Sequence, residues 1–134
     1  MTIRSLEDQA RKTVLNFIAR LGEGKHRDEE LFAETNEKQG NTTNPIGRIW
    51  VMDSQGYLHV GRPEYVNTNL LESESKEVRK IAQEHLQKSA EHPQGMFDTY
   101  IYPDQECLNG TRTFVKRVLC DHNVTYIVGS GFCL

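Results

Sequence analysis

Apolar residues recur every three or four positions near the start of the chain, and charged residues fill the positions between them. This spacing is typical of an amphipathic helix that packs one side on a core. It predicts a long helix over residues 5–21, which glycines at positions 22 and 24 would end. The apolar positions in this helix are Leu6, Ala10, Val14, Phe17, Ile18 and Leu21.

The next segment, residues 25–43, is polar, and Leu31 and Phe32 are its apolar anchors. It predicts a short helix near residues 28–37, followed by a loop. Residues 48–53 then form a run rich in β-forming side chains, and residues 57–60 form a second one. The intervening Ser54-Gln55-Gly56 is a turn sequence, so the two runs predict a β-hairpin.

A second long helix is predicted over about residues 75–91, where Val78, Ile81, Ala82 and Leu86 follow helical spacing. His85 and His92 lie on or beside this charged helix, and we expect both on its solvated face. Three further strands are predicted after it. They cover residues 96–102, 111–120 and 124–133, with a tight turn at residues 121–123.

Hairpin-linked strands pair antiparallel, so the order of elements predicts an α+β fold. We expect a five-stranded antiparallel sheet with a long N-terminal helix and with a second helix between its second and third strands. PAS-like sensor folds have this layout. The 134 residues suit one domain, with the sheet-forming core over residues 47–133.

The amino-acid composition argues against nucleic acid as a binding partner and against a membrane-spanning segment. The formal net charge is -3 and the cationic residues form no block, so we expect no nucleic-acid partner. The longest apolar runs are far shorter than the roughly 20 residues that cross a bilayer, and the charged start of the chain does not resemble a signal peptide. We therefore expect no membrane-spanning segment within this sequence.

The three cysteines are too few for a disulfide framework. Cys120 and Cys133 would lie far apart along the last hairpin, beyond the roughly 7 Å that a bridge between Cα atoms allows. Cys107 precedes the fourth strand and could reach Cys133 at the end of the sheet. The sequence thus predicts either three thiols in a reducing compartment or one bridge between Cys107 and Cys133.

Several segments together resemble the Cache family of sensor domains. Residues 49–58 are similar to the family's aromatic-apolar-Asp-x-x-Gly hairpin, and residues 63–70 to the segment after it. Residues 95–102 and the Tyr126 to Phe132 segment, with its aromatic-x-x-Gly-x-Gly pattern, resemble later strands. Two positions depart from the pattern: Val60 stands where the family has histidine, and Asn67 replaces a glycine. The ligand therefore stays open.

The resemblance implies a sensory domain that stands outside the inner membrane, periplasmic or extracellular, in chemoreceptors, kinases and cyclases. In such proteins, membrane-spanning and signalling segments flank the domain, and neither kind is present in this sequence. The residues themselves leave a cytoplasmic location open.

Strand alternation places Phe114 and Lys116 on one face of the fourth strand. If the last hairpin has a two-residue turn, Lys116 faces Gly129 and Phe114 faces Gly131, which leaves a hollow beside a cation. Such a hollow suits a small carboxylate. On each of the first three strands, two alternate residues share one face. Together they give the hollow an apolar wall that also carries hydroxyl and imidazole groups. The predicted ligand-binding residues are Trp50, Met52, Tyr57, His59, Tyr100, Tyr102, Phe114 and Lys116.

No cofactor, metal site or catalytic residue is predicted. Cys107, Cys120, His122 and Cys133 match no structural zinc spacing, and the acidic residues and histidines show no convergent pattern of an active site. We expect a non-enzymatic sensing domain that binds a small organic anion, either a carboxylate or an amino acid, and signals through its N-terminal helix. The alternative is a PAS-like or profilin-like interaction module without a ligand, in which that helix forms a homodimer.

Overall fold

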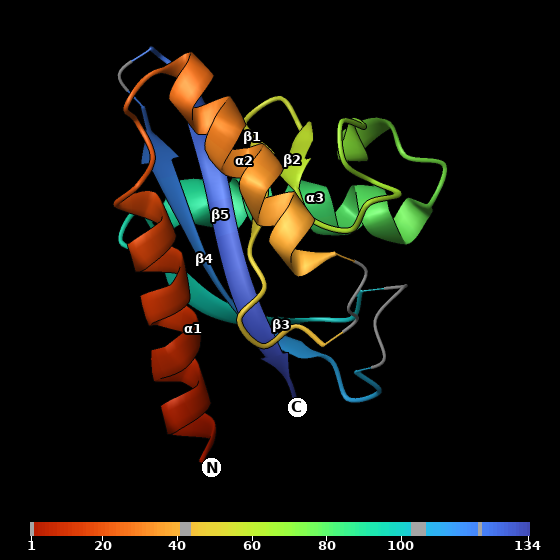
Figure 1. Ribbon diagram of the computed structural model, residues 1–134. Coiled ribbons are helices and arrows are strands. Elements are labelled where there is room, and N and C mark those ends of the chain that lie inside the picture. Colours follow the sequence, from red (N-terminus) through yellow and green to blue (C-terminus); the bar gives the residue numbers. More distant parts are fainter. Residues whose placement is uncertain (1, 41–43, 103–106, 121) are drawn as a thin grey trace.

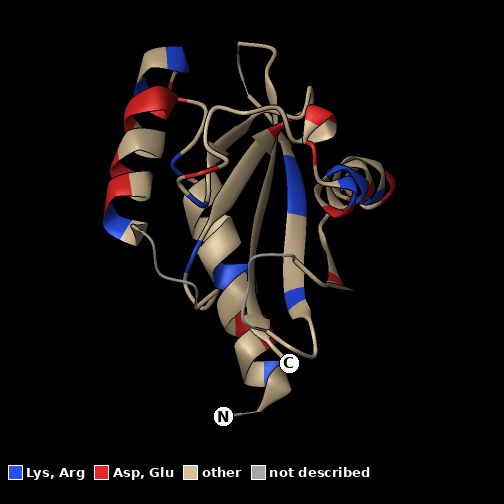
Figure 2. Cartoon of the chain, turned by 90° about the vertical axis from the view of Figure 1, so that its right-hand side faces the viewer, with Lys and Arg blue, Asp and Glu red and all other residues tan. Residues whose placement is uncertain are grey.

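The computed structural model describes residues 2–40, 44–102, 107–120 and 122–134, and it consists of a sheet between two helical layers. Helices α1 (Ile3–Ile18) and α2 (Lys25–Gln39) cover one face of the sheet, and α3 (Lys76–Glu91) covers the other (Figure 1). Figure 2 shows basic and acidic residues interspersed along the helices on both sides. Within the described residues, no helix combines the length and the apolar character needed to cross a membrane.

The sheet has the strand order β2-β1-β5-β4-β3, and every pair of neighbours is antiparallel. The predicted α+β fold, with a five-stranded antiparallel sheet, a long N-terminal helix and a helix between the second and third strands, is therefore confirmed. Strand β5 lies at the centre of the sheet and contacts α1 on one face and α3 on the other. The strands are β1 (Trp50–Asp53), β2 (Leu58–Val60), β3 (Met96–Tyr100), β4 (Thr111–Leu119) and β5 (Thr125–Cys133).

Helix α1 packs Ala10, Val14 and Phe17 against the sheet, as the helical spacing predicts. Its predicted bounds are wrong at both ends. The helix begins earlier because the side chain of Thr2 accepts a hydrogen bond from the backbone N–H of Ser5 at 3.1 Å, which caps the first turn. The chain leaves the helix after Ile18 through tighter turns.

Helix α2 is longer at both ends than the predicted residues 28–37. Its anchors, Leu31 and Phe32, are buried as predicted. The side chain of Asn36 also ties it to the hairpin. Its amide nitrogen donates to the carbonyl of His59 at 2.8 Å, and its amide oxygen accepts from the N–H of Gly61 at 3.1 Å. These long-range bonds explain why a polar segment forms a stable helix.

The pairing of β4 with β5 is not the one that a two-residue turn would give, which was the condition under which Lys116 was expected to face Gly129. The N–H of Cys120 donates to the carbonyl of Val124 at 2.8 Å, so three positions separate this bonded pair, and the first of them, residue 121, lies outside the described residues. Asn123 has a φ of 62°, the left-handed conformation common at the end of such loops. One extra residue in the loop shifts the pairing of the whole hairpin by one position.

This shift changes the partners of the glycine at the middle of β5. Lys116 pairs with Val128, so the predicted pairing of Lys116 with Gly129 is wrong, and Phe114 pairs with Ser130 instead of Gly131. Gly129 lies between Val115 and Trp50. A Cβ atom at Gly129 would lie 2.2 Å from two atoms of the Trp50 indole. The hollow expected beside Lys116 is instead occupied by the Trp50 ring, on the α3 face of the sheet.

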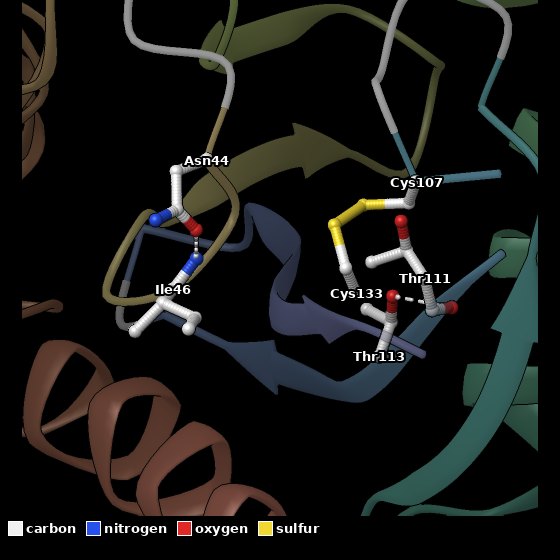
Figure 3. The surroundings of a disulfide bond; sticks show 6 residues. All are labelled: Asn44, Ile46, Cys107, Thr111, Thr113 and Cys133. Atoms are coloured by element: carbon white, nitrogen blue, oxygen red, sulfur yellow. Dashed lines mark hydrogen bonds between the residues drawn. A yellow bond between two sulfur atoms is a disulfide. The ribbon is translucent and has the colours of Figure 1, made fainter. Parts of the chain in front are cut away.

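A disulfide joins Cys107 to Cys133 at the end of β5, with the two Cα atoms 5.0 Å apart (Figure 3). It confirms the second of the two alternatives drawn from the sequence. Cys120 is buried and takes no part in a disulfide. The bridge links the last strand to the segment before β4 and lies beside Thr111.

We expect Gly129→Ala to lower the free energy of unfolding by about 1 to 3 kcal/mol, because the added methyl group overlaps the indole. In a Trp50→Ala background the same substitution should cost little or stabilise, since the overlap is gone and alanine loses less entropy than glycine. Denaturant titration of the wild type, both single variants and the double variant measures this coupling. Equal costs in both backgrounds would contradict the contact.

Thiol titration of the oxidised, denatured protein should find one thiol, that of Cys120, and three after reduction. The bridge spans 26 residues, so the loop-entropy model gives it about 3 to 4 kcal/mol of stability. Cys107→Ser should lose this amount. Reduced wild type is the matched control, because it should be destabilised to the same extent.

Candidate ligand-binding site

A cavity of about 120 Å³ lies between α3 and the sheet. Its wall is mainly apolar and comes from the β1–β2 hairpin, from the segment between β2 and α3, and from one side of α3. Polar groups enter this wall from His85, Tyr102 and Arg62. The lining residues are Trp50, Met52, Leu58, Gly61, Arg62, Tyr65, Leu70, Val78, Ile81, Ala82, His85 and Tyr102.

Helix α3 presents its cavity side by ordinary helical spacing. Ser75 caps the helix, because its hydroxyl accepts from the N–H of Val78 at 3.3 Å. From Val78, steps of three or four residues lead to Ala82 and His85 on the same side. The cap fixes the residue at which α3 begins. The side of the helix that carries Val78, Ala82 and His85 therefore faces the sheet and the cavity.

The segment between β2 and α3 closes another side of the cavity. It folds back along the hairpin, because the N–H of Leu58 donates to the carbonyl of Thr68 at 3.0 Å and the N–H of Leu70 donates to the carbonyl of Gly56 at 2.9 Å. A short 3₁₀-helix, Leu70–Glu72, follows. These backbone bonds hold Tyr65 and Leu70 against the cavity.

An aromatic cluster forms the end of the cavity nearest β5. The ring centroid of His85 lies 4.4 Å from that of Trp50 and 4.4 Å from that of Tyr100. The hydroxyl oxygen of Tyr102 lies 3.1 Å from Nε2 of His85, which is hydrogen-bonding distance. His85 is thus held between two strands and has a fixed orientation.

The polar groups of this cluster are neutral near pH 7. Burial and, to a smaller extent, the charge of Lys88 together lower the pKa of His85 to about 3, although the Asp98 carboxylate acts in the opposite direction. Burial also raises the pKa of Tyr102. Among the described residues, Nδ1 of His85 has no hydrogen-bond partner. The arrangement offers apolar contact together with neutral hydrogen-bonding groups.

Four of the predicted site residues gather on this face. Trp50, Met52 and Tyr102 line the cavity, and Tyr100 packs behind His85. Tyr100 is buried, with 3% of its surface exposed. The sequence analysis grouped these four residues correctly, although their role in binding a ligand stays a prediction.

The structure places Tyr57 and His59 away from the cavity. Met52 pairs with Leu58, and cross-strand partners share a face, so the neighbours of Leu58 point to the opposite side. His59 lies under α2, where its Nε2 is 2.9 Å from a carboxylate oxygen of Asp53. Tyr57 is 42% exposed. Their predicted grouping with Met52 is therefore wrong.

Phe114 and Lys116 also lie on the α1 and α2 face. Phe114 is buried in the core beneath α1. The Lys116 ammonium donates to the carbonyl of Pro93 at 2.8 Å. Val115, which lies between them, packs on the other face with Tyr100. The predicted combination of Lys116 with Trp50 and the tyrosines is wrong because the last hairpin is shifted by one residue.

His85 is the main site residue that the sequence analysis missed. We expected it on a solvated face, but it is 4% exposed. The signal was present, because the side chains at Ala82, His85 and Ser89 continue the helical spacing and all three are buried. No periodic pattern marks Arg62, Tyr65 and Leu70, since the first two lie in an irregular segment and Leu70 begins a 3₁₀-helix of only three residues.

Comparison with known proteins returns little. No family model matches the sequence, and no curated protein sequence matches it. Among solved structures, the PAS domain from Bordetella pertussis BvgS is similar, with a TM-score of 0.49 and 14% sequence identity. That match covers 82% of this chain and 88% of the other.

The buried His85 should make the protein sensitive to acid. In the unfolded chain a histidine takes up a proton below about pH 6.5, whereas in the folded protein His85 stays neutral until pH is about 3. Stability that is present above pH 6.5 is therefore lost as pH falls, by about 1.4 kcal/mol for each pH unit. Denaturant titrations from pH 7 to pH 4.5 should show a shallower loss for His85→Gln.

The matched control is His92→Gln, at the exposed C-cap of the same helix. Its stability should follow that of the wild type across the same pH range. A loss of stability that is as steep in His85→Gln as in the wild type would show that His85 is not the group responsible.

Proposed function

We propose that the chain is a small-molecule sensing domain, the input module of a signal-transduction protein, and that it binds a small organic anion beneath α3. The observation that carries this proposal is the mainly apolar cavity of about 120 Å³. Its size is close to that of an engineered cavity of roughly 150 Å³ that binds benzene in another protein. A ligand with a core of about six non-hydrogen atoms fits this space.

The polar groups in the cavity wall favour a ligand that is anionic and that can form hydrogen bonds. Arg62 brings a positive charge to the cavity, and its guanidinium donates to Glu64 at 2.7 Å, which helps to orient it. His85 and Tyr102 add neutral hydrogen-bonding groups. A carboxylate or an amino acid with a small apolar side chain satisfies both kinds of contact.

Strand β5 provides a route from the ligand to the N-terminal helix. The Trp50 ring lies over Gly129 on the cavity face of β5. On the opposite face of the same strand, Val128 and Phe132 belong to the core that includes Val14 of α1. A ligand that displaces the Trp50 ring acts on the backbone of β5, and α1 packs directly on that strand. We propose that occupancy is transmitted to α1 in this way.

An extracytoplasmic, Cache-like domain is the context we propose. The disulfide between Cys107 and Cys133 supports an oxidising compartment, such as the periplasm or the cell surface. The pattern of residues 49–58 and 126–132 supports the Cache family. In this context the domain binds its ligand outside the membrane and a separate segment carries the signal inward.

A thermal-shift screen against small carboxylates, amino acids and amines tests the proposal. A ligand at 100 times its dissociation constant adds about 2.7 kcal/mol, which raises Tm by about 2 to 8 °C per kcal/mol. Ala82→Leu fills part of the cavity and should abolish the shift. Lys116→Met, on the opposite face of the sheet, should leave it unchanged.

If no compound raises Tm, the sensing proposal fails and the interaction-module alternative is favoured. Sedimentation of the wild type would then be expected to show a dimer. Helix α1 leaves Ile3 and Leu15 exposed at 59% and 41%, and these residues are the positions to substitute in that case.

A further inference from the structure

A second, smaller cavity lies beside the ligand cavity. Its volume is about 60 Å³. Trp50, Gly61, Arg62 and Tyr102 line both cavities, so the two spaces are adjacent and share a wall. A group of a few non-hydrogen atoms fits the smaller one.

The chemistry of the second cavity differs from that of the first. Two arginines, Arg48 and Arg62, line it from the segments before β1 and after β2. Thr113 and Ser130, on the central strands, also line it, and the Ser130 hydroxyl donates to the carbonyl of Arg48. A guanidinium presents a planar set of donors that matches the two oxygens of a carboxylate. Two such groups at one small cavity favour an anion over a neutral or cationic group.

Neighbouring elements hold both arginines at this place. Arg48 donates through Nη1 to the carbonyls of Gln39 and Gly40, at 3.4 and 3.3 Å, where α2 ends. Arg62 donates through Nε to a carboxylate oxygen of Glu64. Burial lowers the pKa of Arg48, the charge of Arg62 adds to this lowering, and the Glu64 carboxylate opposes it, so the two guanidiniums repel each other and Glu64 offsets part of the repulsion. A bound anion would relieve this repulsion.

We infer that the two cavities form one bipartite site for an amphipathic carboxylate. The apolar group of the ligand occupies the larger cavity beside Trp50, and its carboxylate lies against Arg48 and Arg62 in the smaller one. This inference rests on the proposed function, and it narrows the ligand from small organic anions in general to those with an apolar ring or a branched alkyl group.

Calorimetric titration of phenylacetate and of phenylacetamide tests the inference, because the two probes have nearly the same shape and differ in charge. Phenylacetate should bind the wild type about 10- to 100-fold more tightly, which is the range of a charged hydrogen bond. Arg62→Gln should remove most of this preference and leave the affinity for phenylacetamide unchanged. Arg62→Lys, which keeps the charge, should retain part of it.

Lys116→Met is the matched control, because it removes a cation from the opposite face of the sheet, and it should bind both probes as the wild type does. Equal affinities of the two probes for the wild type would overturn the bipartite site while the sensing cavity stands. A preference that survives in Arg62→Gln would overturn it as well. If neither probe binds the wild type, the inference fails, whereas the proposed function fails only if the thermal-shift screen also finds no ligand. The phenylacetamide affinity of each variant reports whether its cavity is intact.

Discussion

The indole of Trp50 lies over Gly129 of the central strand, and the α3 face of the sheet is arranged around this contact. Any side chain at position 129 would push the ring outward, toward His85, whose ring is 4.4 Å from it. The ring thereby sets the distance at which α3 packs there. On the α1 and α2 face, aromatic residues that include Phe114 and Phe132 belong to the core beneath the helices.

Most of the fold could be predicted from periodicity alone. The spacing of Ala10, Val14 and Phe17 predicted α1, and runs of β-forming residues between turn sequences predicted the strands. The helix bounds could not be predicted as well. They depend on single hydrogen bonds, such as the Thr2 cap and the bridge from Asn36 to the hairpin. Many polar residues in the sequence could form a hydrogen bond of this kind, so the sequence alone does not show which of them ends a helix.

The candidate site was predicted only in part, and the reason is register. Trp50, Met52, Tyr100 and Tyr102 were grouped correctly because alternation within a strand is a local property. Placing Lys116 required the length of the last turn, where a single residue decides which face a side chain shares with its partner strand. Arg62 lies in a segment without periodicity, and its position depends on backbone bonds that fold this segment onto the hairpin.

Trp50 is also the only tryptophan in the sequence, so the protein carries a single natural indole fluorophore, and it lines both cavities. The emission wavelength of an indole follows the polarity of its surroundings. Any molecule that replaces water beside this ring, or turns the ring away from Gly129, changes that polarity. A molecule bound beside this ring would therefore change the emission spectrum of the unlabelled protein, without a background from other tryptophans.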